Sequence, residues 1–381
     1  MKSNKNIMAS KSNISIALAS TLKPVDDIRM YKKLVLSGLE VMPDVAWHLI
    51  GFSTQNNLEN TPNNVFFYPI FNFSRLSWQR LRANFKLYQL LKKIKPTHLI
   101  VCTAELLPSA VQYAKKNNII LIYDVRENYA ANVLYSNTYP KIIRSLFAKT
   151  IRTIEKWADK FIHTYLVAEK IYIEEMPFIQ KKSIILENKT TISPKISLQI
   201  EKKSHHNFII AGTLGESYGV FLGIDWAIKM QKKIPDFSLT IIGNCAKITD
   251  FDKLKNISKN YHWINFLADT KPIPYTKIIE NIEKNDVLLM PYLPEKHLLQ
   301  RIPTKFYEGL ALQKIMLIQK NIHWENFFTQ FNFKSTIFID FNESQDIKFE
   351  NFYQNYELPE WIFWKNEKKI WQKFLNNLCI K

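Results

Sequence analysis

Clustered glycines are the first feature of this 381-residue sequence that could do chemistry. Of its eight glycines, Gly212, Gly215, Gly219 and Gly223 fall within twelve residues, directly after a predicted strand. A glycine-rich turn between a strand and a helix lets backbone amides approach a phosphate, and the helix dipole adds to the attraction. A tight turn that packs helix against sheet without a ligand is the alternative interpretation. The spacing Gly-x-Gly-x-x-Gly is absent, which argues against a nicotinamide cofactor.

A second group of polar residues follows the predicted strand Val287–Met290. The loop Pro291–Ile302 leads into a predicted helix opened by Pro303, because proline is favoured at the first helical position. Thr304 belongs to the same helix start, whose backbone amides are free to bind an anion. A solvated helix start without a ligand is the alternative here.

Three charged side chains lie at this helix start. Glu308 comes four residues after Thr304 on the same helix face, where a carboxylate can accept two hydrogen bonds from a ribose diol. Arg301 and Lys305 could neutralise a leaving pyrophosphate, because cleavage of a glycosidic phosphate develops negative charge on that oxygen. Ligands of open α/β sheets collect beyond the carboxyl ends of strands. Since both groups follow strands, together they predict a nucleotide site.

Other residues give weak signals for metal or redox chemistry. The Asp-x-Asp sequence Asp250-Phe251-Asp252 is a two-residue match of a kind that occurs often by chance. Adjacent His205 and His206 are expected to be exposed. The three cysteines, Cys102, Cys245 and Cys379, are far apart and lack metal-ligand or redox spacing, so we expect reduced, buried thiols. The sequence therefore predicts no metal and no cofactor.

Short β-branched runs alternate with longer amphipathic stretches, which predicts parallel sheets flanked by helices. In the first half, strands are predicted at Ile14–Ala19, Val45–Gly51, Val65–Tyr68, His98–Cys102, Ile119–Tyr123, Phe161–His163 and Ile184–Leu186. In the second half they are predicted at Phe208–Ala211, Ser238–Ile242, Trp263–Phe266, Val287–Met290, Ile315–Ile318 and Thr336–Ile339. Helical patterns include Leu76–Lys93, Tyr139–Ala158 and Ile362–Leu378.

The pattern restarts in the second half, which predicts two globular domains. We place an N-terminal domain at 1–195, a C-terminal domain at 196–355, and a helix at 356–381 that packs back across both. The polar stretch Asn188–His206 has the composition of an interdomain linker.

The net charge of +18 is concentrated in the first half of the chain. Residues 51–100 have seven basic side chains and one acidic one, interleaved with aromatic residues, a mixture that suits an anionic membrane surface. A lysine-rich surface kept soluble by like charge is an equal alternative, and nucleic-acid binding a weaker third. No apolar run is long enough for a membrane span and the start lacks a signal peptide's pattern, so we expect a cytoplasmic protein, peripheral at most on the inner face of the membrane.

The sequence resembles bacterial retaining glycosyltransferases of family 4 through nearly its whole length. The likeness is carried by Thr21–Lys33, Tyr123–Tyr129, Gly212–Gly219 and Pro303–Ala311. It implies the GT-B fold, an α/β architecture of two Rossmann-like domains whose parallel sheets face a central cleft. It also implies a donor site in the C-terminal domain, an acceptor site on the N-terminal domain, and retention of anomeric configuration without a metal.

The resemblance assigns roles to individual residues. Glu308 matches the second glutamate of the family's Glu-x7-Glu motif, which binds the nucleotide ribose. The predicted donor-binding residues are Gly212, Thr213, Gly215, Glu216, Gln300, Pro303, Thr304, Lys305 and Glu308. The predicted acceptor-binding residues are Asp27, Arg29, Arg126, Glu127 and Asn128. Glu308, Arg301 and Lys305 are predicted to serve catalysis.

Three departures from the family pattern bear on these roles. Gln300 stands where the first glutamate of the motif is expected, and Arg126 stands where many relatives have histidine, so that it could bind an anionic acceptor. The Arg and Lys that relatives often carry after the glycine-rich turn are missing, which leaves phosphate neutralisation to Arg301, Lys305 and helix dipoles.

The predicted function is transfer of a hexose from a nucleotide diphosphate sugar to a lipid-linked or polysaccharide acceptor. A nucleotide-sugar 2-epimerase of the same architecture is the second hypothesis. A non-catalytic scaffold that keeps the fold is the third, motivated by Gln300, Arg126 and the missing basic pair.

Overall fold

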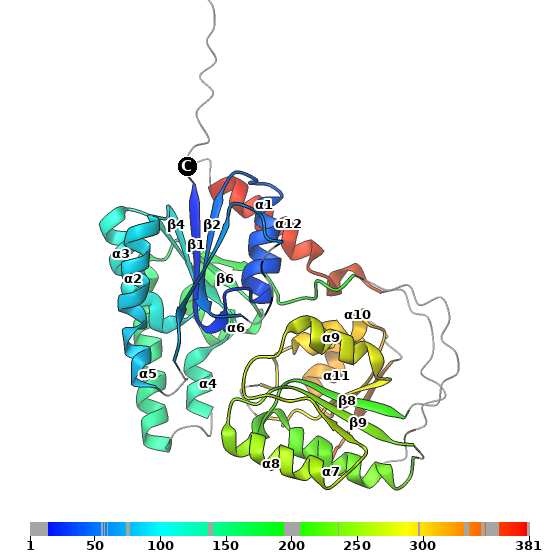
Figure 1. The fold of residues 1–381 in the computed structure, drawn as a ribbon. Coiled ribbons are helices and arrows are strands. Elements are labelled where there is room, and N and C mark those ends of the chain that lie inside the picture. Colours follow the sequence, from blue (N-terminus) through cyan, green and yellow to red (C-terminus); the bar gives the residue numbers. More distant parts are fainter. Residues whose placement is uncertain are drawn as a thin grey trace, which may run out of the picture. The chain divides into compact units, whose positions relative to one another are not determined.

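The structure, a computed structural model, describes residues 14–54, 56, 58, 60–73, 77–135, 140–193, 206–234, 236–295, 298–330, 335–343, 347 and 358–378. The chain divides into two compact units (Figure 1). Unit 1 comprises Met1–Glu187 together with Glu367–Lys381, and unit 2 comprises Asn188–Asn366. The unit boundaries fall at 187/188 and 366/367, whereas the sequence placed them at 195/196 and 355/356.

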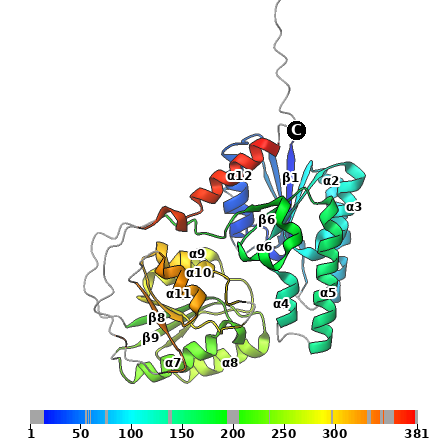
Figure 2. The ribbon, with the colours of Figure 1, turned by 180° about the vertical axis from the view of Figure 1, so that it is seen from behind.

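Unit 1 is built on a seven-stranded parallel sheet in the order β3-β2-β1-β4-β5-β6-β7. Its strands are β1 (Ser15–Pro24), β2 (Ala46–Phe52), β3 (Val65–Phe71), β4 (His98–Val101), β5 (Ile120–Val125), β6 (Thr164–Val167) and β7 (Ser183–Ile185). Its longer helices are α2 (Ala83–Ile94), α3 (Leu107–Asn117), α4 (Tyr129–Tyr135), α5 (Lys141–Ala158) and α12 (Lys365–Leu378). Its shorter helices are η1 (Ile28–Val35), α1 (Leu36–Leu39), η2 (Trp78–Arg82), η3 (Ala104–Leu106), η4 (Asp159–Phe161), α6 (Ile171–Glu175) and η5 (Pro177–Lys182). Helices α2, α3 and α5 cover one face of the sheet, and α1 and α12 lie on the other (Figures 1 and 2).

Unit 2 is built on a six-stranded parallel sheet in the order β10-β9-β8-β11-β12-β13. Its strands are β8 (Asn207–Thr213), β9 (Ser238–Asn244), β10 (Ile264–Phe266), β11 (Val287–Met290), β12 (Ile315–Gln319) and β13 (Thr336–Ile339). The helices are η6 (Glu216–Tyr218), α7 (Val220–Gln231), α8 (Ile248–Lys259), α9 (Tyr275–Lys284), α10 (Thr304–Ala311), α11 (Ile322–Thr329) and η8 (Glu360–Ile362). Residues of α7 and α8 pack into one apolar cluster and those of α9, α10 and α11 into another, so the sheet is covered on both faces.

The predicted strands are confirmed with one exception. Strands covered on both faces must be apolar along their length, which is why continuous β-branched runs predict them. All residues of β4, β11 and β12 are buried. The strand predicted at Phe161–His163 is wrong. Helix α5 continues into the short helix η4, which ends at Phe161, and the strand begins at Thr164. The first residues of the predicted helices Leu76–Lys93 and Tyr139–Ala158 lie outside the described residues.

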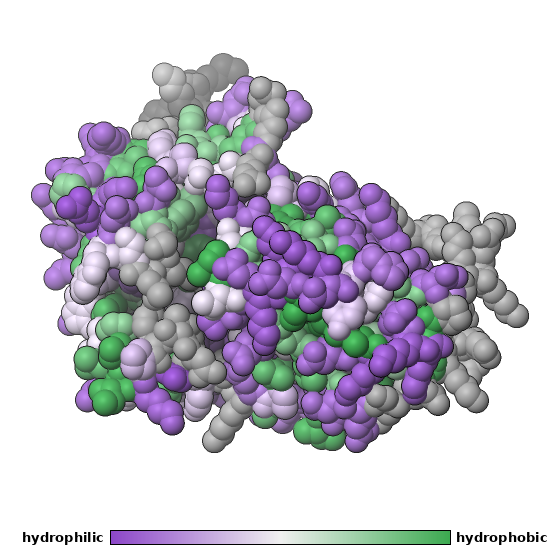
Figure 3. Space-filling view, turned by 60° about the horizontal axis from the view of Figure 1, so that its bottom comes forward, coloured by the Kyte–Doolittle hydropathy of each residue, from purple (hydrophilic) through white to green (hydrophobic). Residues whose placement is uncertain are grey.

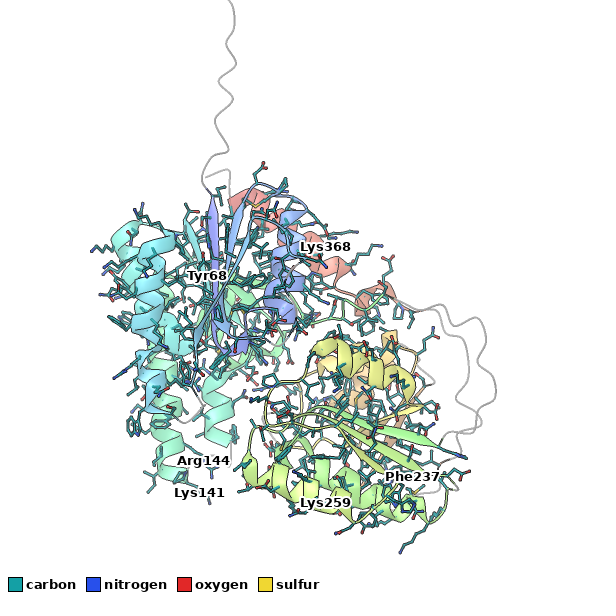
Figure 4. The ribbon with its side chains drawn as sticks, in the orientation of Figure 1. Tyr68, Lys141, Arg144, Phe237, Lys259 and Lys368 are labelled. Atoms are coloured by element: carbon teal, nitrogen blue, oxygen red, sulfur yellow. The ribbon has the colours of Figure 1, made fainter. Side chains whose placement is uncertain are left out.

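The C-terminal helix α12 packs on the first unit. The indole of Trp371 donates a hydrogen bond to the carbonyl of Leu34 (2.9 Å), and the amide of Gln372 donates one to the carbonyl of Ser37 (2.9 Å). Lys368, labelled in Figure 4, pairs with Glu40 at 2.5 Å. The end of the chain therefore completes the helical layer on one face of the N-terminal sheet.

Candidate functional site

The strand order of unit 2 places its switch point at the two loops that the sequence singled out. From β8 the chain continues to β9 on one side, whereas β11 pairs with β8 on the other side. At such a switch point the loops after the two central strands diverge, and ligands bind beyond the carboxyl ends of those strands. The glycine-rich turn follows β8, and the loop from Pro291 to Ile302 follows β11.

Two of the four clustered glycines are required for packing. Gly219 has φ +70°, and a Cβ atom there would lie 1.6 Å from the carbonyl oxygen of Pro291. A Cβ atom at Gly223 would lie 2.8 Å from both Ile210 and Pro291. Any larger residue at Gly219 would push the turn away from the loop after β11. The alternative interpretation, close packing, therefore holds for these two positions.

Gly212 instead faces the side chain of Lys305. It has φ +120°, and a Cβ atom there would lie 3.2 Å from Cε of Lys305 and 4.0 Å from its ammonium nitrogen. The ammonium group also forms a buried ion pair with the carboxylate of Glu308. The fold thus brings the glycine-rich turn and the helix start together, with a lysine between them.

Glu308 is enclosed by hydroxyl groups as well as by Lys305. Its residue is 5% exposed, and the Tyr275 hydroxyl hydrogen-bonds to it and to Thr190. Burial, and then the Glu308 carboxylate, raise the pKa of Tyr275, and the same two causes raise the pKa of Tyr292. A carboxylate has about four acceptor positions. Lys305 and Tyr275 use two of them.

Helix α10 begins one residue later than predicted. It spans Thr304–Ala311, and Pro303 is the N-cap residue rather than the first helical residue. Pro303 has φ −58° and ψ 138°, and this ψ is extended and not helical. Its carbonyl nevertheless accepts the first hydrogen bond of the helix, as that of an N-cap residue does. No side chain caps the start of α10, so no side-chain oxygen competes with an anion for its first amides.

Arg301 and Gln300 lie just before this helix in different environments. Arg301 is buried, and its carbonyl accepts a hydrogen bond from the Trp324 indole (2.8 Å). Asn321 donates to the carbonyl of Leu299 (3.0 Å) and anchors the same stretch on α11. Gln300 is exposed at the loop surface. Of the predicted donor-binding residues, Lys305, Glu308 and Gly212 are therefore brought together by contacts, whereas Gln300 is not.

Asp250 has a role that its Asp-x-Asp context did not indicate. Its carboxylate accepts a hydrogen bond from the amide of Glu216 (3.2 Å), inside the glycine-rich turn, and pairs with Lys247 at 2.8 Å. A Cβ atom at Gly215 would lie 3.5 Å from the same carboxylate. Asp252 is exposed, so the two aspartates point to different surroundings. Asp250 therefore fixes the turn and occupies one of its amides.

Exchanging Asp250 should separate these two effects. We expect Asp250→Ala to lower the free energy of unfolding by about 0.5–2 kcal/mol, the scale of a lost cap. Asp250→Asn keeps an acceptor for the Glu216 amide but removes a negative charge beside the turn, so it should lose less stability and bind a nucleoside diphosphate more tightly. Urea unfolding and calorimetric titration with nucleoside diphosphates measure the two quantities. The exposed Asp252→Asn is the matched control, and an equal gain in affinity there would remove Asp250 from the site.

In unit 1, Arg126 and Asp27 form an ion pair beyond the carboxyl end of β5. Nη2 of Arg126 lies 2.6 Å from Oδ1 of Asp27, which also accepts hydrogen bonds from the amides of Arg29 (3.1 Å) and Met30 (3.2 Å). Burial opposes charge on both partners, but their attraction outweighs it: the pKa of Asp27 is lowered and that of Arg126 is raised. Both groups are therefore charged, and Asp27 also caps helix η1.

Arg29 and Asn128 are structural, which corrects their predicted contact with an acceptor. Arg29 is 1% exposed, and its guanidinium binds the Asp124 carboxylate (2.7 Å) and the Leu186 carbonyl (2.7 Å). Asn128 is buried; it caps α4 through the amide of Ala131 and binds Arg152 (2.6 Å) and Glu175 (2.7 Å). Both side chains hold elements of the unit together instead of facing a ligand.

A polar cluster at the switch point of unit 1 was missed by the sequence analysis. The order of this sheet reverses between β1 and β4, and Glu105 follows β4. Its carboxylate accepts hydrogen bonds from Thr21, beyond the β1–β4 pairing, and from Arg80. Burial raises the pKa of Glu105, and Arg80 opposes that shift. The only signal in the sequence was an acidic residue shortly after a buried strand. Glu127, one of the predicted acceptor-binding residues, accepts a hydrogen bond from Asn132 (2.7 Å).

Metal and membrane-spanning features are absent from the part of the chain that the structure describes. No group of three or more His, Cys, Asp or Glu side chains there could hold a metal ion. None of the described helices is both long enough and apolar enough to cross a bilayer. Cys102 and Cys245 are buried free thiols, as predicted, whereas Cys379 and His205 lie outside the described residues.

Comparisons with known proteins identify the fold. No protein-family model and no curated protein sequence matches the chain. Sucrose-phosphate synthase from Thermosynechococcus elongatus is similar over 87% of this chain and 87% of its own, with a TM-score of 0.59 and 12% identity. HepE from Anabaena, in complex with UDP-glucose, is similar over 97% and 90%, with a TM-score of 0.53 and 13% identity. UDP-GlcNAc 2-epimerase from Methanocaldococcus jannaschii is similar over 97% and 99%, with a TM-score of 0.53 and 11% identity. The chain has the GT-B fold, as predicted.

Proposed function

We propose that this protein is a glycosyltransferase that binds a nucleotide diphosphate sugar in unit 2 and transfers its hexose to a hydroxyl group. The observation that carries this proposal is the buried Lys305–Glu308 pair at the glycine-rich turn, beyond the carboxyl ends of β8 and β11. Sucrose-phosphate synthase and HepE, structures of the same fold, support the choice of substrate class. Membership of family 4 is part of this proposal.

The donor is assigned by charge and hydrogen-bonding capacity. Lys305 is the cation at the glycine-rich turn, next to Gly212 and near the start of α10, where a diphosphate would meet both an ammonium group and free amides. Glu308 has acceptor positions left for the two ribose hydroxyls. Lys305 and Arg301 replace the basic pair missing from the turn itself, and we propose that no metal is needed for this reason.

The proposed reaction retains the configuration of the sugar. The bond between the anomeric carbon and the diphosphate oxygen breaks, and a bond from the same carbon to the acceptor oxygen forms on the same face. The acceptor hydroxyl proton moves to the leaving phosphate oxygen, so no enzyme nucleophile is required. Lys305, Arg301 and the helix dipole stabilise the negative charge that develops on the diphosphate.

On the acceptor side, Arg126 favours an anionic group. Its side chain is 9% exposed, and its Nη1 atom is buried without a hydrogen-bond partner among the described residues. An unsatisfied buried donor costs about 1–3 kcal/mol, so an oxygen supplied by a ligand would be stabilising. A phosphate or carboxylate of a lipid-linked or polysaccharide acceptor supplies such an oxygen. Asp27, which holds Arg126 in place, and Glu127 complete the proposed acceptor side.

A nucleotide-sugar 2-epimerase is the second candidate, because UDP-GlcNAc 2-epimerase from M. jannaschii has the same fold over 97% of this chain. Epimerised free sugar or nucleotide sugar appearing without any acceptor would favour it. A non-catalytic scaffold would bind nucleotide but show neither transfer nor donor hydrolysis.

A nucleotide screen tests the proposed function. The full chain is heated with nucleoside diphosphates and their sugars, with UDP as the first probe because the HepE structure holds UDP-glucose, and the melting temperature is recorded. A ligand at 100 times its Kd stabilises the folded state by about 2.7 kcal/mol, so at least one nucleoside diphosphate should raise the melting temperature clearly. Sugar transfer is then assayed with that donor and a panel of neutral and phosphorylated glycans. If no nucleoside diphosphate stabilises the protein at millimolar concentration, the proposed function is wrong.

A further inference from the structure

The hairpin formed by α4 and α5 in unit 1 exposes large apolar side chains at its free end. Ile142 is 87% exposed and Leu146 is 62% exposed, both on α5. On the end of α4, Leu134 is 40% exposed. Monomeric proteins seldom leave contiguous large apolar side chains in water without a partner. This end of the hairpin is therefore a candidate contact surface.

Helix geometry places these side chains on common faces. Ile142 and Leu146 are four residues apart, as are Ile143 and Phe147, and such pairs lie above one another on an α-helix. Of the residues from 141 to 150, only Ala148 is buried, so this half of α5 is exposed nearly all round. In Figures 1 and 2 the paired ends of α4 and α5 extend beyond the sheet of unit 1. Figure 3 shows green hydrophobic residues among purple hydrophilic ones on the face of the molecule that it draws.

A second set of exposed apolar side chains lies on η2 and the start of α2. Trp78 is 86% exposed, Leu81 is 72% exposed and Phe85 is 66% exposed. Side chains three residues apart eclipse one another in a 3₁₀ helix, so Trp78 and Leu81 point the same way. Helix α3 lies between α2 and α5: Phe85 and Pro108 line one shallow depression, and Pro108 and Trp157 line the next. Helices α2 and α5, which carry the two sets, therefore belong to the same helical layer of unit 1.

The charged side chains among these apolar ones are basic. Residues 141–154 contain Lys141, Arg144, Lys149 and Arg152 and no acidic residue. Figure 4 shows Lys141 and Arg144 at the outer end of α5 with their side chains pointing away from the helix. Arg82 and Lys86 accompany the second set, together with Arg80, whose charge is paired with that of Glu105. A second copy of this chain would bring like charges together on this face, whereas a negatively charged surface would neutralise them.

We propose that the α4–α5 end and η2 form a surface that docks on an anionic lipid bilayer. Apolar side chains of an interfacial helix enter the boundary between headgroups and acyl chains, and lysines and arginines beside them attract anionic lipids. The sequence suggested an anionic membrane partner for residues 51–100. The structure adds α4 and α5 and identifies the exposed side chains that would contact the bilayer. The inference deepens the proposed function, because a lipid-linked acceptor is presented at a bilayer.

Vesicle sedimentation tests the docking surface. The full chain is mixed with vesicles of phosphatidylcholine alone or with phosphatidylglycerol, at low and high salt. We expect binding to the anionic vesicles only, weakened by salt because screening shortens the reach of the charges. Ile142→Asp/Leu146→Asp and Lys141→Glu/Arg144→Glu should each weaken binding roughly tenfold or more. Ile322→Asp on α11, 63% exposed in unit 2, is the matched control and should bind like the parent protein.

Three other outcomes would overturn the proposed docking surface. Equal binding to both lipid types would exclude the electrostatic part, and an equal loss in the Ile322→Asp control would exclude the named location. If Ile142→Asp/Leu146→Asp changes the oligomeric state on gel filtration and the parent protein does not bind vesicles, this surface contacts a second copy of the protein instead. The exposed positions leave folding intact, which unchanged melting temperatures of the variants would verify. Vesicle binding without any nucleotide effect would contradict the proposed function and leave this inference standing.

Discussion

Replacing Lys305 with methionine should weaken UDP binding roughly 10- to 100-fold, because hydrogen bonds to charged groups contribute about 1.5–3 kcal/mol. The same change should lower the free energy of unfolding. The side chains of Lys305 and Glu308 are 11% and 7% exposed, so removing one partner leaves the other charge buried. Breaking such a buried pair costs about 3–5 kcal/mol, and the Tyr275 hydroxyl relieves part of that cost. Urea unfolding measures the stability, and calorimetric titration measures the affinity.

The double variant Lys305→Met/Glu308→Gln separates stability from binding. It removes both charges and keeps similar side-chain volumes, and replacing a whole buried ion pair is often nearly neutral for stability. We therefore expect most of the lost stability to return while UDP binding stays weak. If the double variant binds UDP as tightly as the parent protein, Lys305 is only the counterion of Glu308 and the donor assignment is incorrect.

Replacing Glu308 with glutamine should distinguish the nucleoside from the diphosphate. The amide retains the size of the side chain but accepts hydrogen bonds at one oxygen only, so a ribose diol loses a partner. The expected loss of UDP affinity is about 1–3 kcal/mol. Pyrophosphate has no ribose, and Lys305 is freed from its carboxylate partner, so pyrophosphate should bind as well as before or more tightly. Competition titrations with UDP and pyrophosphate measure both affinities.

Glu280→Gln, an exposed glutamate on α9 in the same unit, is the control for the loss of one negative charge. It should leave both affinities unchanged. A parallel loss of UDP and pyrophosphate affinity in Glu308→Gln would show that Glu308 acts on the diphosphate, through the geometry of Lys305, and not on the ribose.

The overall fold could be predicted closely because its signals are local. Strand β13 has the predicted bounds, Thr336–Ile339, and β11 has the predicted bounds Val287–Met290. Burial of a parallel strand on both faces requires an unbroken apolar run, which is visible in the sequence without knowledge of the neighbours. The strand predicted at Phe161–His163 was placed too early. The residues that follow helix α5 include apolar ones, so the hydrophobic pattern did not mark where the strand begins.

The proposed donor side rests in part on equally local signals. Glycines after a strand, and Lys305 and Glu308 at a helix start, mark an anion site through local geometry alone. The contacts around them were not predictable. Tyr275 reaches Glu308 from α9, and Asp250 reaches the glycine-rich turn from α8. Neither contact follows a periodicity, since each depends on which strands are neighbours in the sheet.

By itself, the sequence determined the two α/β halves, the glycine-rich turn after β8 and the charged helix start after β11. Only the tertiary structure decided which charged residues are available to a ligand. Arg29 and Asp124 are 95 positions apart yet form a buried pair, whereas Arg126 keeps one buried nitrogen without a partner among the described residues. The physical reason is that periodicity records which face of its own element a residue occupies, while pairing is set by the strand order that brings distant loops to one edge of a sheet.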